Sequence, residues 1–553
     1  MQDTLDRMRF LSLTRAVGAV LIIVVIFLGF PARSLQAQPL TIPLTSFAPG
    51  AADLGYSRVA VGPDGSIALA VEIHHNGTWK IAVQRYGSTL EPVGPLHLFE
   101  SCGIFWTSAY TELPELLFHP TGYLIVVFQQ TGDFDLGGDS IFSSEIHVGL
   151  IDPSGQRVDT APGSEDCVES FVYYDDGSRA DRPRFDLTPN GELLLIADGF
   201  FGNTNYRNVA IQAMDNELNA IDGLLRVVPH VDELSAEALH WYSDIATNGS
   251  LLLATWHECP FIDNQGNYSD CDVKTQFASI TETGLVPVGG NQPVNVGDAP
   301  GTLNILASAD MNASGNSVVV WLDARVNPNG AVFGQRFNAS GQPIGANFQI
   351  SAGQQPFPPA DVVGYIYRRP EVAMLDDGRF MAVWTEVAPN GTQGIAMGRR
   401  YSAAGVPFES PQPLVESGTL STAFPHVVSD GTGFIATWIG VEGQQASLFL
   451  ATFGEPVAGE RASLLPENVR LDANYPNPFS ESTMISFEIA KTDRVRLTLH
   501  DLLGREVQVL VDEVRSAGHH SILLDARDLP SGAYFYQLEA GQSRQTRLAT
   551  LMR

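Results

Sequence analysis

Arginine side chains recur where short apolar strands begin. The guanidinium group binds carboxylate, sulfate or phosphate through paired hydrogen bonds, which makes arginine well suited to an anionic ligand. Such strand-start polar residues are Arg58, Arg182, Arg369, Glu115, His240, Tyr242 and His426. If these strands converge on one axis, their side chains form a ligand site there. The competing interpretation is structural, because strand-end arginines in an acidic protein also pair with nearby Asp and Glu.

The strands that must position these residues belong to a repeat that runs from about residue 50 to residue 460. Each unit has an apolar strand, a polar turn that ends in Gly, and a second apolar strand such as "NSVVVW" or "RFMAVW". Glycine suits these turns because tight hairpins need a positive φ. The first-turn glycines are Gly65, Gly122, Gly191, Gly249, Gly315, Gly378 and Gly431. The pattern therefore predicts seven units.

A second periodic turn adds two more strands to the unit. Its glycines are Gly155, Gly284, Gly341 and Gly405. Four-stranded sheets repeated radially make a β-propeller, which leaves only short protected edges. We therefore expect an all-β fold with a propeller of seven four-stranded blades over residues 38–460.

Two details of the repeat predict how the blades pack and close. Trp256, Trp321, Trp384 and Trp438 fall at nearly the same place in their units, and we expect them to pack between neighbouring blades. The segment "PLTIPLTSFAPG" is similar to the fourth strands of the repeat. We predict that Thr41–Ser46 pairs with a strand of the last unit and completes that blade.

Propellers host both binding and catalysis, so the fold alone does not choose between them. The combination of arginines, a tyrosine and carboxylates resembles that of sialidases, although the S-x-D-x-G-x-T-W turn repeat of that family is absent. P-loop, GxGxxG, GxSxG and HExxH motifs are absent too, and no catalytic set is predicted. The leading hypothesis is an extracellular scaffold that binds a glycan or a protein. The alternative is a polysaccharide-active hydrolase or lyase, similar to a sialidase.

Two acidic loops have the oxygen ligands that Ca²⁺ prefers. One is "GDFDLGGDS", with Asp133, Asp135 and Asp139; the other is "IDNQGNYSDCD", with Asp263, Asp270 and Asp272. Neither matches an EF-hand loop, and Gly and Asp are also ordinary turn residues. Calcium is the single cofactor that the sequence suggests.

Charge and the N-terminus indicate where the protein works. The net charge of −30 argues against nucleic-acid binding, which needs clustered Lys and Arg. Residues 1–37 have basic residues before an apolar run, which is typical of a secretory signal peptide and too short for a permanent membrane anchor. Export permits disulfides among the four cysteines. We favour Cys259 with Cys271, which close a short loop, and therefore Cys102 with Cys167.

The last ninety or so residues follow a different pattern. After a linker at 461–474, which includes an alternative domain start near 465, segments such as "TMISFEIA" and "RVRLTLHD" alternate apolar and polar residues. Such alternation predicts half-buried antiparallel strands. Six or seven strands in this length match an Ig-like sandwich, which we expect over residues 475–553.

The tail contains three specific motifs, "YPNPF", "HDLLGREV" and "AGHHSILLDARDLPSGAYFYQL". With these motifs the tail resembles the type A C-terminal sorting domain of the type IX secretion system of Bacteroidota and related bacteria. The residues that carry the match are Tyr475, Pro476, Asn477, Pro478, Phe479, Gly504, Gly518, Gly532 and Tyr534. The resemblance implies export by the type IX machinery to the cell surface or the medium. It also implies removal of the tail, followed by release or by attachment to surface lipopolysaccharide.

Overall fold

The computed structural model describes only part of residues 40–551. The described ranges are 40–43, 51–75, 78–88, 90–101, 106–135, 140–158, 167–168, 171–172, 179–188, 191–200, 207–214, 225–226, 238–260, 270–281, 284–298, 302–326, 330–351, 369–387, 394–415, 421–442, 445–454, 469–471, 474, 479, 482–489, 492–500, 505–515, 518–527, 529–541 and 543–551. Every regular element among them is a β-strand. Among these residues, no helix is long and apolar enough to cross a membrane.

The first part of the chain forms antiparallel groups of strands. The first group is β2 (Ala51–Val61), β3 (Ile67–His75), β4 (Thr78–Tyr86) and β5 (Pro92–Ser101). The second is β6 (Trp106–Phe118), β7 (Leu124–Asp135), β8 (Ser140–Ile151) and β10 (Phe171–Val172). They join into one nine-stranded sheet through the parallel pair Trp79–Tyr110, and β9 (Cys167–Val168) pairs with β5.

Four-stranded sheets follow in chain order. They are β11 (Arg179–Leu187), β12 (Leu193–Phe200), β13 (Arg207–Met214) and β14 (Leu225–Arg226); β15 (Ala238–Thr247), β16 (Leu251–Pro260), β17 (Asp272–Thr281) and β18 (Gly284–Pro293); β19 (Asn304–Met311), β20 (Ser317–Asp323), β21 (Ala331–Phe337) and β22 (Pro343–Gln349); and β23 (Glu371–Met374), β24 (Phe380–Val387), β25 (Gly394–Tyr401) and β26 (Gln412–Pro413).

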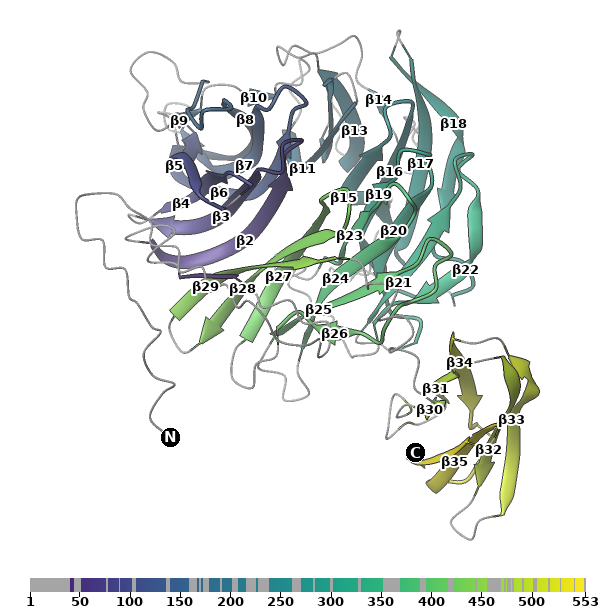
Figure 1. The fold of residues 1–553 in the computed structure, drawn as a ribbon. Coiled ribbons are helices and arrows are strands. Elements are labelled where there is room, and N and C mark those ends of the chain that lie inside the picture. The colour runs from purple at the N-terminus through teal and green to yellow at the C-terminus, as the bar shows by residue number, and fades with distance from the viewer. Residues whose placement is uncertain are drawn as a thin grey trace, which may run out of the picture.

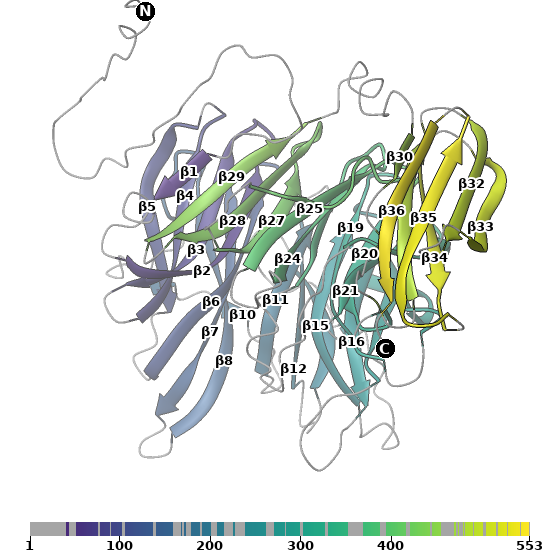
Figure 2. The ribbon, with the colours of Figure 1, turned by 90° about the horizontal axis from the view of Figure 1, so that it is seen from below.

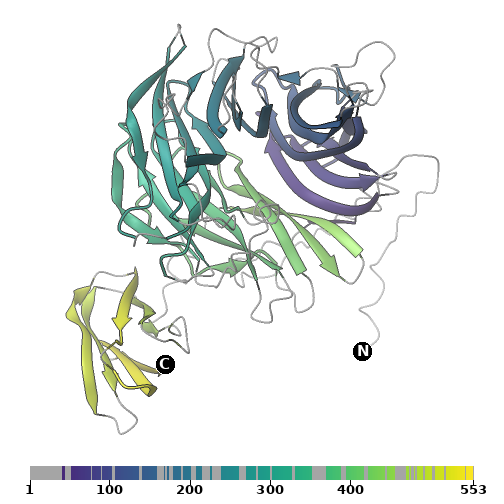
Figure 3. The same ribbon diagram turned by 180° about the vertical axis from the view of Figure 1, so that it is seen from behind.

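The last of these sheets joins the two ends of the repeat. It contains β27 (Ser421–Ser429), β28 (Phe434–Glu442), β29 (Gln445–Phe453) and the N-terminal strand β1 (Leu40–Pro43). Thr41 pairs with Phe449 and Pro43 with Ser447, which confirms the predicted pairing of this segment; residues 44–50 lie outside the described part. Figures 1 and 3 show the sheets arranged around a centre, with β27–β29 beside β2. The fold is therefore an all-β propeller closed by pairing of strands from opposite ends of the chain.

The predicted turns and tryptophans have their expected roles. All of the first-turn and second-turn glycines have positive φ, from 71° at Gly341 to 116° at Gly284. The four repeat tryptophans are fully buried, and they belong to core clusters that include residues of neighbouring sheets. Both predictions are confirmed.

An unpredicted bulge recurs in the innermost strands, where two residues lie opposite one residue of the next strand. The register shifts in this way between Glu112 and Glu115 in β6, and equivalent shifts occur in β2, β11, β15, β19 and β27. The first bulge residue has positive φ in four of these strands, although none is glycine: Leu113, Tyr242, Leu306 and Phe424. Bulges re-aim the side chains that follow them, which matters for the axis of the propeller.

The third strands carry another recurring device. In β4, β17 and β21 the register shifts around a glutamine, and its amide donates to carbonyls of the outer strand, as Gln84 does to Gly94. The arginine after two of these glutamines reaches the next group of strands along the chain. Arg85 donates to the Gly122 carbonyl at 2.7 Å, and Arg336 donates to the Ala403 carbonyl at 2.8 Å. These bonds tie neighbouring groups of strands together near their turns.

The tail consists of two sheets that share one core. The first is β30 (Val469–Leu471), β31 (Ser482–Ile489) and β34 (Gly518–Asp525); the second is β33 (Glu506–Arg515), β32 (Asp493–His500), β35 (Gly532–Ala540) and β36 (Ser543–Leu551). Ile485 and Phe487 of the first sheet pack in one cluster with Leu497 and Tyr536 of the second. Figure 2 shows the tail strands β30–β36 together, in yellow, at the right of the picture. Strand β30 lies inside the expected linker, so the described strands of the tail begin at Val469, near the alternative start.

Candidate functional site

The residue directly after each bulge occupies one equivalent register position in its strand, and Glu371 occupies the same position in β23, where no register shift is described. Because the strands surround one axis, these positions form a ring, which we call the axial ring. Its members are Ser57, Glu115, Arg184, Asp244, Ser308, Glu371 and His426. Hydrogen bonds join residues of the axial ring across neighbouring strands. For example, Ser308 Oγ donates to Glu371 Oε2 at 3.2 Å.

Two arginines bridge two carboxylates in the axial ring. Arg184 places Nη1 2.6 Å from Glu115 and Nη2 2.9 Å from Glu371. Arg58, one residue after Ser57, places Nε 3.0 Å from Glu115 and Nη2 3.3 Å from Glu371. All four side chains are at most 12% exposed. Buried charges are costly unless they are paired, so this arrangement makes their burial tolerable.

Arg369 is less completely satisfied than the other two arginines. Its Nη2 lies 2.9 Å from Asp244 as an ion pair without good hydrogen-bond alignment, and Nη1 donates to the Ser243 carbonyl at 3.4 Å. Its Nε has no hydrogen-bond partner among the described residues. Burial lowers the pKa of the guanidinium, and the positive charge of Arg184 adds to this effect. A buried donor without a partner is a place where a ligand atom or water gains a strong hydrogen bond.

Burial and neighbouring charges push the two bridged carboxyl groups in opposite directions. Burial raises the pKa of Glu115, despite the opposing effects of Arg184 and Arg58. Burial would also raise the pKa of Glu371, but Arg184, Arg58 and Arg369 together hold it well below its usual range. Burial, and then the positive charge of Arg58, lower the pKa of His426 well below the usual value. The imidazole of His426 is therefore neutral at pH 7. Its Nδ1 accepts a hydrogen bond from Val59 at 3.3 Å.

A small cavity lies against this network. Its lining residues are Tyr56, Arg58, Leu113, Glu115, Pro183, Arg184, Tyr242 and Arg369. Its volume of about 20 Å³ has room for about one water molecule. The aromatic and apolar part of the lining comes from bulge residues, and the charged part from the axial ring and its neighbours. The cavity therefore admits one small polar group rather than a whole sugar.

The structure brings together most of the predicted ligand residues. Arg58, Glu115, Tyr242 and Arg369 line the cavity. His426 belongs to the axial ring and has Arg58 as an electrostatic neighbour. Arg182 and His240 have described backbones, but their side chains lie outside the described part.

The sequence did not single out Arg184, Asp244 and Glu371. A usable signal was present, since Pro precedes four of the axial-ring residues: Glu115, Arg184, Glu371 and His426. Proline cannot donate to the sheet ladder and is tolerated at bulges. A recurring "RPR", "RPE", "LPE" or "FPH" at the start of a strand therefore marks the bulge and the axial residue after it.

The predicted calcium loops are only partly described. Asp133 and Asp135 lie in β7 and pair with Phe142 and Ser140 of β8; their side chains and Asp139 lie outside the described part. In the second loop Asp263 is also outside, whereas Asp272 pairs with Lys274 at 3.0 Å. Within the described ranges, no group of three or more His, Cys, Asp or Glu is placed to hold a metal ion.

The predicted disulfide between Cys259 and Cys271 is present, with an S–S distance of 2.02 Å. It joins the end of β16 to the residue before β17, which closes the short loop between these paired strands. Cys102 lies outside the described residues, so its pairing with Cys167 stays a prediction.

The tail motif is described at four of its positions. Phe479 is 4% exposed and donates its backbone N–H to Thr550 at 2.9 Å. The Tyr534 hydroxyl donates to the Pro530 carbonyl at 2.7 Å. Gly518 pairs with Ile489, and Gly532 pairs with Leu551. Residues 475–478 and Gly504 lie outside the described part.

The fold and its axial ring define an all-β propeller followed by a separate two-sheet tail. Residues 473–549 match the family model of the secretion system C-terminal sorting domain. The tail is thus a type IX sorting domain, and it implies handling by the type IX secretion machinery and a secreted or cell-surface location. No curated protein matches the chain.

Solved structures similar to this chain are distant. A protein of unknown function from Dyadobacter fermentans has 14% identity and a TM-score of 0.41, and the match covers 64% of this chain and 97% of that one. The polysaccharide lyase Uly1 has 10% identity and a TM-score of 0.40, with 74% and 91% covered. An α-L-arabinofuranosidase from Fusarium graminearum has 12% identity and a TM-score of 0.40, with 67% and 98% covered. Similarities this low do not identify an activity.

Proposed function

We propose that this protein is an exported propeller scaffold that binds an extracellular glycan or protein through an anionic group placed at the axial cavity. The observation that carries the proposal is Arg369, a buried cavity-lining arginine whose Nε has no hydrogen-bond partner among the described residues. An incoming carboxylate or sulfate oxygen supplies that partner. Arg58 and Arg184 line the same cavity and add positive potential.

Three details of the architecture belong to the proposal. Residues 38–460 form seven four-stranded blades, which is supported by one axial-ring residue in each innermost strand. The region from about 475 is an Ig-like sandwich, supported by the shared core of its two sheets. Residues 1–37 are a signal peptide that is removed during export.

The charge of the site can adjust to an anion. Three arginines face three carboxyl groups: Glu115, Glu371 and Asp244. Because burial raises the pKa of Glu115 whereas neighbouring arginines lower that of Glu371, Glu115 takes up a proton more readily than Glu371. When a ligand anion approaches, protonation of Glu115 restores the balance of charge. Binding is therefore expected to strengthen as pH falls.

Binding is favoured over catalysis by the way the carboxylates are held. Glu115 and Glu371 are each bridged by both Arg58 and Arg184. A catalytic acid or base must reach a substrate atom, whereas these carboxylates are already occupied. The cavity also has no room for a sugar ring within the described residues.

The test is binding of the purified full-length chain to a panel of acidic and neutral glycans. Arg369→Met should weaken capture of acidic glycans at least tenfold, because it removes the unpartnered donor. Arg336→Met is the matched control, since Arg336 reaches a neighbouring sheet rather than the axis. Equal binding by wild type and Arg369→Met, or equal capture of neutral glycans, would contradict an anion site at the axis.

One observation favours the second candidate, a polysaccharide-active hydrolase or lyase. The pKa of Glu115 is raised and that of Glu371 is lowered within one network, and paired carboxyl groups with diverging pKa values are typical of acid–base catalysis. Incubation with the same glycans followed by detection of new reducing ends or unsaturated products distinguishes the two functions. Turnover that is lost in Glu115→Gln would establish the enzyme; binding without turnover supports the scaffold.

The sorting role predicts a separate experiment in a bacterium with a type IX system. Deletion of residues 465–553 should leave the propeller in the periplasm, because the machinery no longer recognises it. Undiminished surface export of the truncated protein would contradict this. With the full chain, fractionation of cells and medium distinguishes attachment to lipopolysaccharide from release after cleavage.

A further inference from the structure

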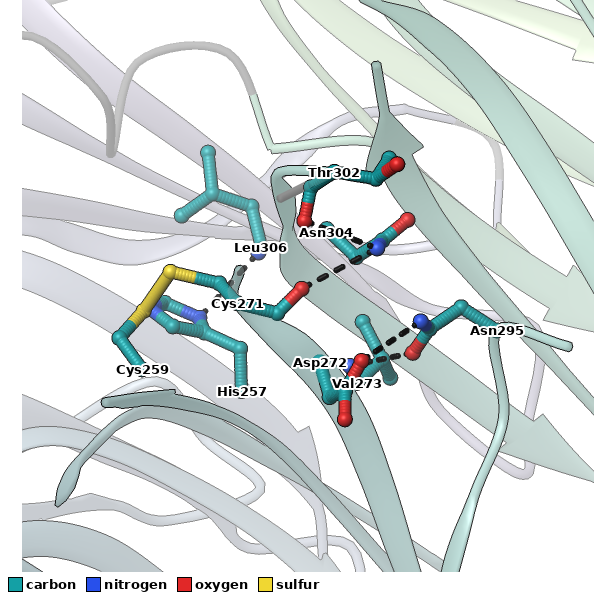
Figure 4. Close-up of a disulfide and its surroundings, with 9 residues drawn as sticks. All are labelled: His257, Cys259, Cys271, Asp272, Val273, Asn295, Thr302, Asn304 and Leu306. Atoms are coloured by element: carbon teal, nitrogen blue, oxygen red, sulfur yellow. Dashed lines mark hydrogen bonds between the residues drawn. A yellow bond between two sulfur atoms is a disulfide. The ribbon is translucent and has the colours of Figure 1, made fainter. Parts of the chain in front are cut away.

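A cluster of oxygen atoms lies beside the disulfide, where β17 meets the connector between β18 and β19. Figure 4 shows Cys271 and Asp272 on one side, with Asn295, Thr302 and Asn304 facing them. Asp298 of the same connector belongs to the cluster through hydrogen bonds from both asparagines. None of these groups takes part in the axial site.

Three oxygen atoms converge on one amide nitrogen. Asn304 Nδ2 lies 2.7 Å from Asp298 Oδ2, 3.1 Å from the Cys271 carbonyl and 3.5 Å from the Thr302 carbonyl. An amide NH₂ has two hydrogens, so it does not satisfy three acceptors well. The Oδ1 atom of the same side chain is buried and has no hydrogen-bond partner among the described residues. A buried oxygen without a partner is costly.

The second asparagine of the cluster differs from Asn304. Asn295 Nδ2 lies 2.9 Å from Asp272 Oδ1 and 3.0 Å from Asp298 Oδ2, and its Oδ1 accepts from Val273 N–H at 2.7 Å. Both ends of this carboxamide are satisfied, so its orientation is fixed. No hydrogen bond among the described residues fixes the Oδ1 of Asn304 in its present direction. Rotation of the Asn304 carboxamide by half a turn would exchange Nδ2 and Oδ1, so that Oδ1 faced the three converging oxygens.

We propose that this cluster binds a calcium ion. Its ligands are the Asp298 carboxylate, the carbonyls of Cys271 and Thr302, and Asn304 Oδ1 after that rotation, with water completing the shell. Ca²⁺ takes carboxylate, amide and carbonyl oxygens at about 2.3–2.6 Å, and two such ligands at a right angle lie about 3.4 Å apart. The separations around Asn304 Nδ2 are 2.7–3.5 Å, so small shifts convert the cluster into a coordination shell.

The donor set and its surroundings favour Ca²⁺ over other metals. Oxygen donors of this mixed kind suit Ca²⁺ rather than zinc, which prefers histidine and thiolate. Asp272 adds negative charge through Oδ1, while its Oδ2 is engaged by Lys274 at 3.0 Å. The disulfide to Cys259 anchors the Cys271 carbonyl. With one direct carboxylate and a second nearby, we expect an affinity in the range of extracellular modules, on the order of 10⁻⁴ to 10⁻³ M.

The first test is calorimetric titration of the chelator-treated full-length protein with CaCl₂. Asp298→Asn should weaken the site at least tenfold, because it removes the coordinating charge while keeping an oxygen that accepts from the asparagines. Asp152→Asn is the matched control: Asp152 also accepts hydrogen bonds within a turn but lies in another sheet. The proposal is overturned if the wild-type protein takes up no calcium, or if the Asp298→Asn variant binds calcium as tightly as the wild-type protein does.

A second variant keeps the proposal falsifiable if Asp298→Asn does not fold. Asn304→Asp adds a carboxylate at the rotating position, so it should tighten calcium binding about tenfold and melt at a lower temperature than wild type in chelator. Added Ca²⁺ should recover that loss, whereas a purely structural asparagine predicts loss without recovery. Absence of calcium-dependent recovery therefore overturns the site.

Discussion

Two half-buried aspartates link neighbouring innermost strands just beyond the axial ring. Asp186 lies two residues after Arg184 and accepts the backbone N–H of Thr247 at 2.8 Å. Asp310 lies two residues after Ser308 and accepts the N–H of Met374 at 2.6 Å. Burial raises the pKa of each carboxyl group to about 7, although these hydrogen bonds oppose the shift. Both groups therefore titrate near neutral pH.

Stability should depend on pH through these two carboxyl groups. Their folded pKa is above the ordinary value of 3.8, so the folded state holds protons that the unfolded chain has released. The free energy of unfolding then falls as pH rises from about 4 to about 7, by at most about 1.4 kcal/mol per pH unit for each group. Asp186→Asn and Asp310→Asn do not titrate, so each should flatten this slope. Urea unfolding at pH 5, 6, 7 and 8 measures it.

Asp64→Asn serves as the control for this pH series, because a hydrogen bond from Ser66 holds the pKa of that exposed carboxyl group below its usual range. The control should leave the slope between pH 5 and 8 unchanged. If Asp186→Asn and Asp310→Asn also leave the slope unchanged, these two carboxyl groups do not titrate near pH 7, contrary to the expectation from their burial.

At the level of single residues, the sequence found part of the axial site. Arg58, Glu115 and Arg369 were predicted and line the cavity. Arg182 was predicted in the third unit; its side chain lies outside the described part, and the structure places Arg184 in the axial ring. Side-chain direction alternates along a strand, so it depends on register, and a bulge of two residues opposite one breaks the count. Ion pairing between distant strands, such as Arg184 with Glu371, has no local signal.

The outer strands contain two glycines that separate backbone strain from steric contact. Gly94 in β5 has φ 73° and Gly345 in β22 has φ 74°. A methyl group at Gly94 would overlap the Gly155 carbonyl in the turn that follows β8, whereas a methyl group at Gly345 meets nothing within 4 Å. The two positions share a backbone conformation and differ in their surroundings.

Alanine at these two positions should therefore have unequal costs. Gly345→Ala should lower the free energy of unfolding by roughly 1–2 kcal/mol, the cost of a left-handed conformation for an L-residue. Gly94→Ala should cost a further 1–3 kcal/mol or so, because the overlap forces β5 away from the turn at Gly155. Chemical denaturation of both variants gives the difference. Equal costs would mean that the contact between β5 and the turn at Gly155 is loose.

The elements themselves were predictable where a local rule determines them. Tight turns demand positive φ and select glycine, so the first-turn and second-turn positions could be found from the sequence. The positive φ inside the bulges could not, because Leu113, Tyr242, Leu306 and Phe424 adopt it without being glycine. Surrounding structure imposes that conformation: Leu113 N–H, for example, donates to the buried carboxylate of Glu72 in β3. Such tertiary effects override local propensity.

On the scale of the whole molecule, the repeat region and the tail have separate cores. Every residue of the tail core lies between Leu471 and Leu551, and the other core clusters of the described residues lie between Leu54 and Ala451. Closure of the ring by β1 and β29 involves no residue of the tail. A tail that is recognised by the secretion machinery and then removed has to leave the propeller intact, and separate cores permit this.

Separate cores predict two unfolding transitions, because each unit loses its own buried surface cooperatively. Tyr536→Phe tests this assignment: the hydroxyl accepts the Asn474 N–H at 2.7 Å inside the tail, and its loss leaves a buried donor unsatisfied. The cost, about 1–3 kcal/mol, should lower the melting temperature of the tail alone in differential scanning calorimetry. Trp321→Phe, a change within the propeller core, should lower only the other transition. A single transition that both variants shift equally would show that the tail and the propeller unfold as one unit.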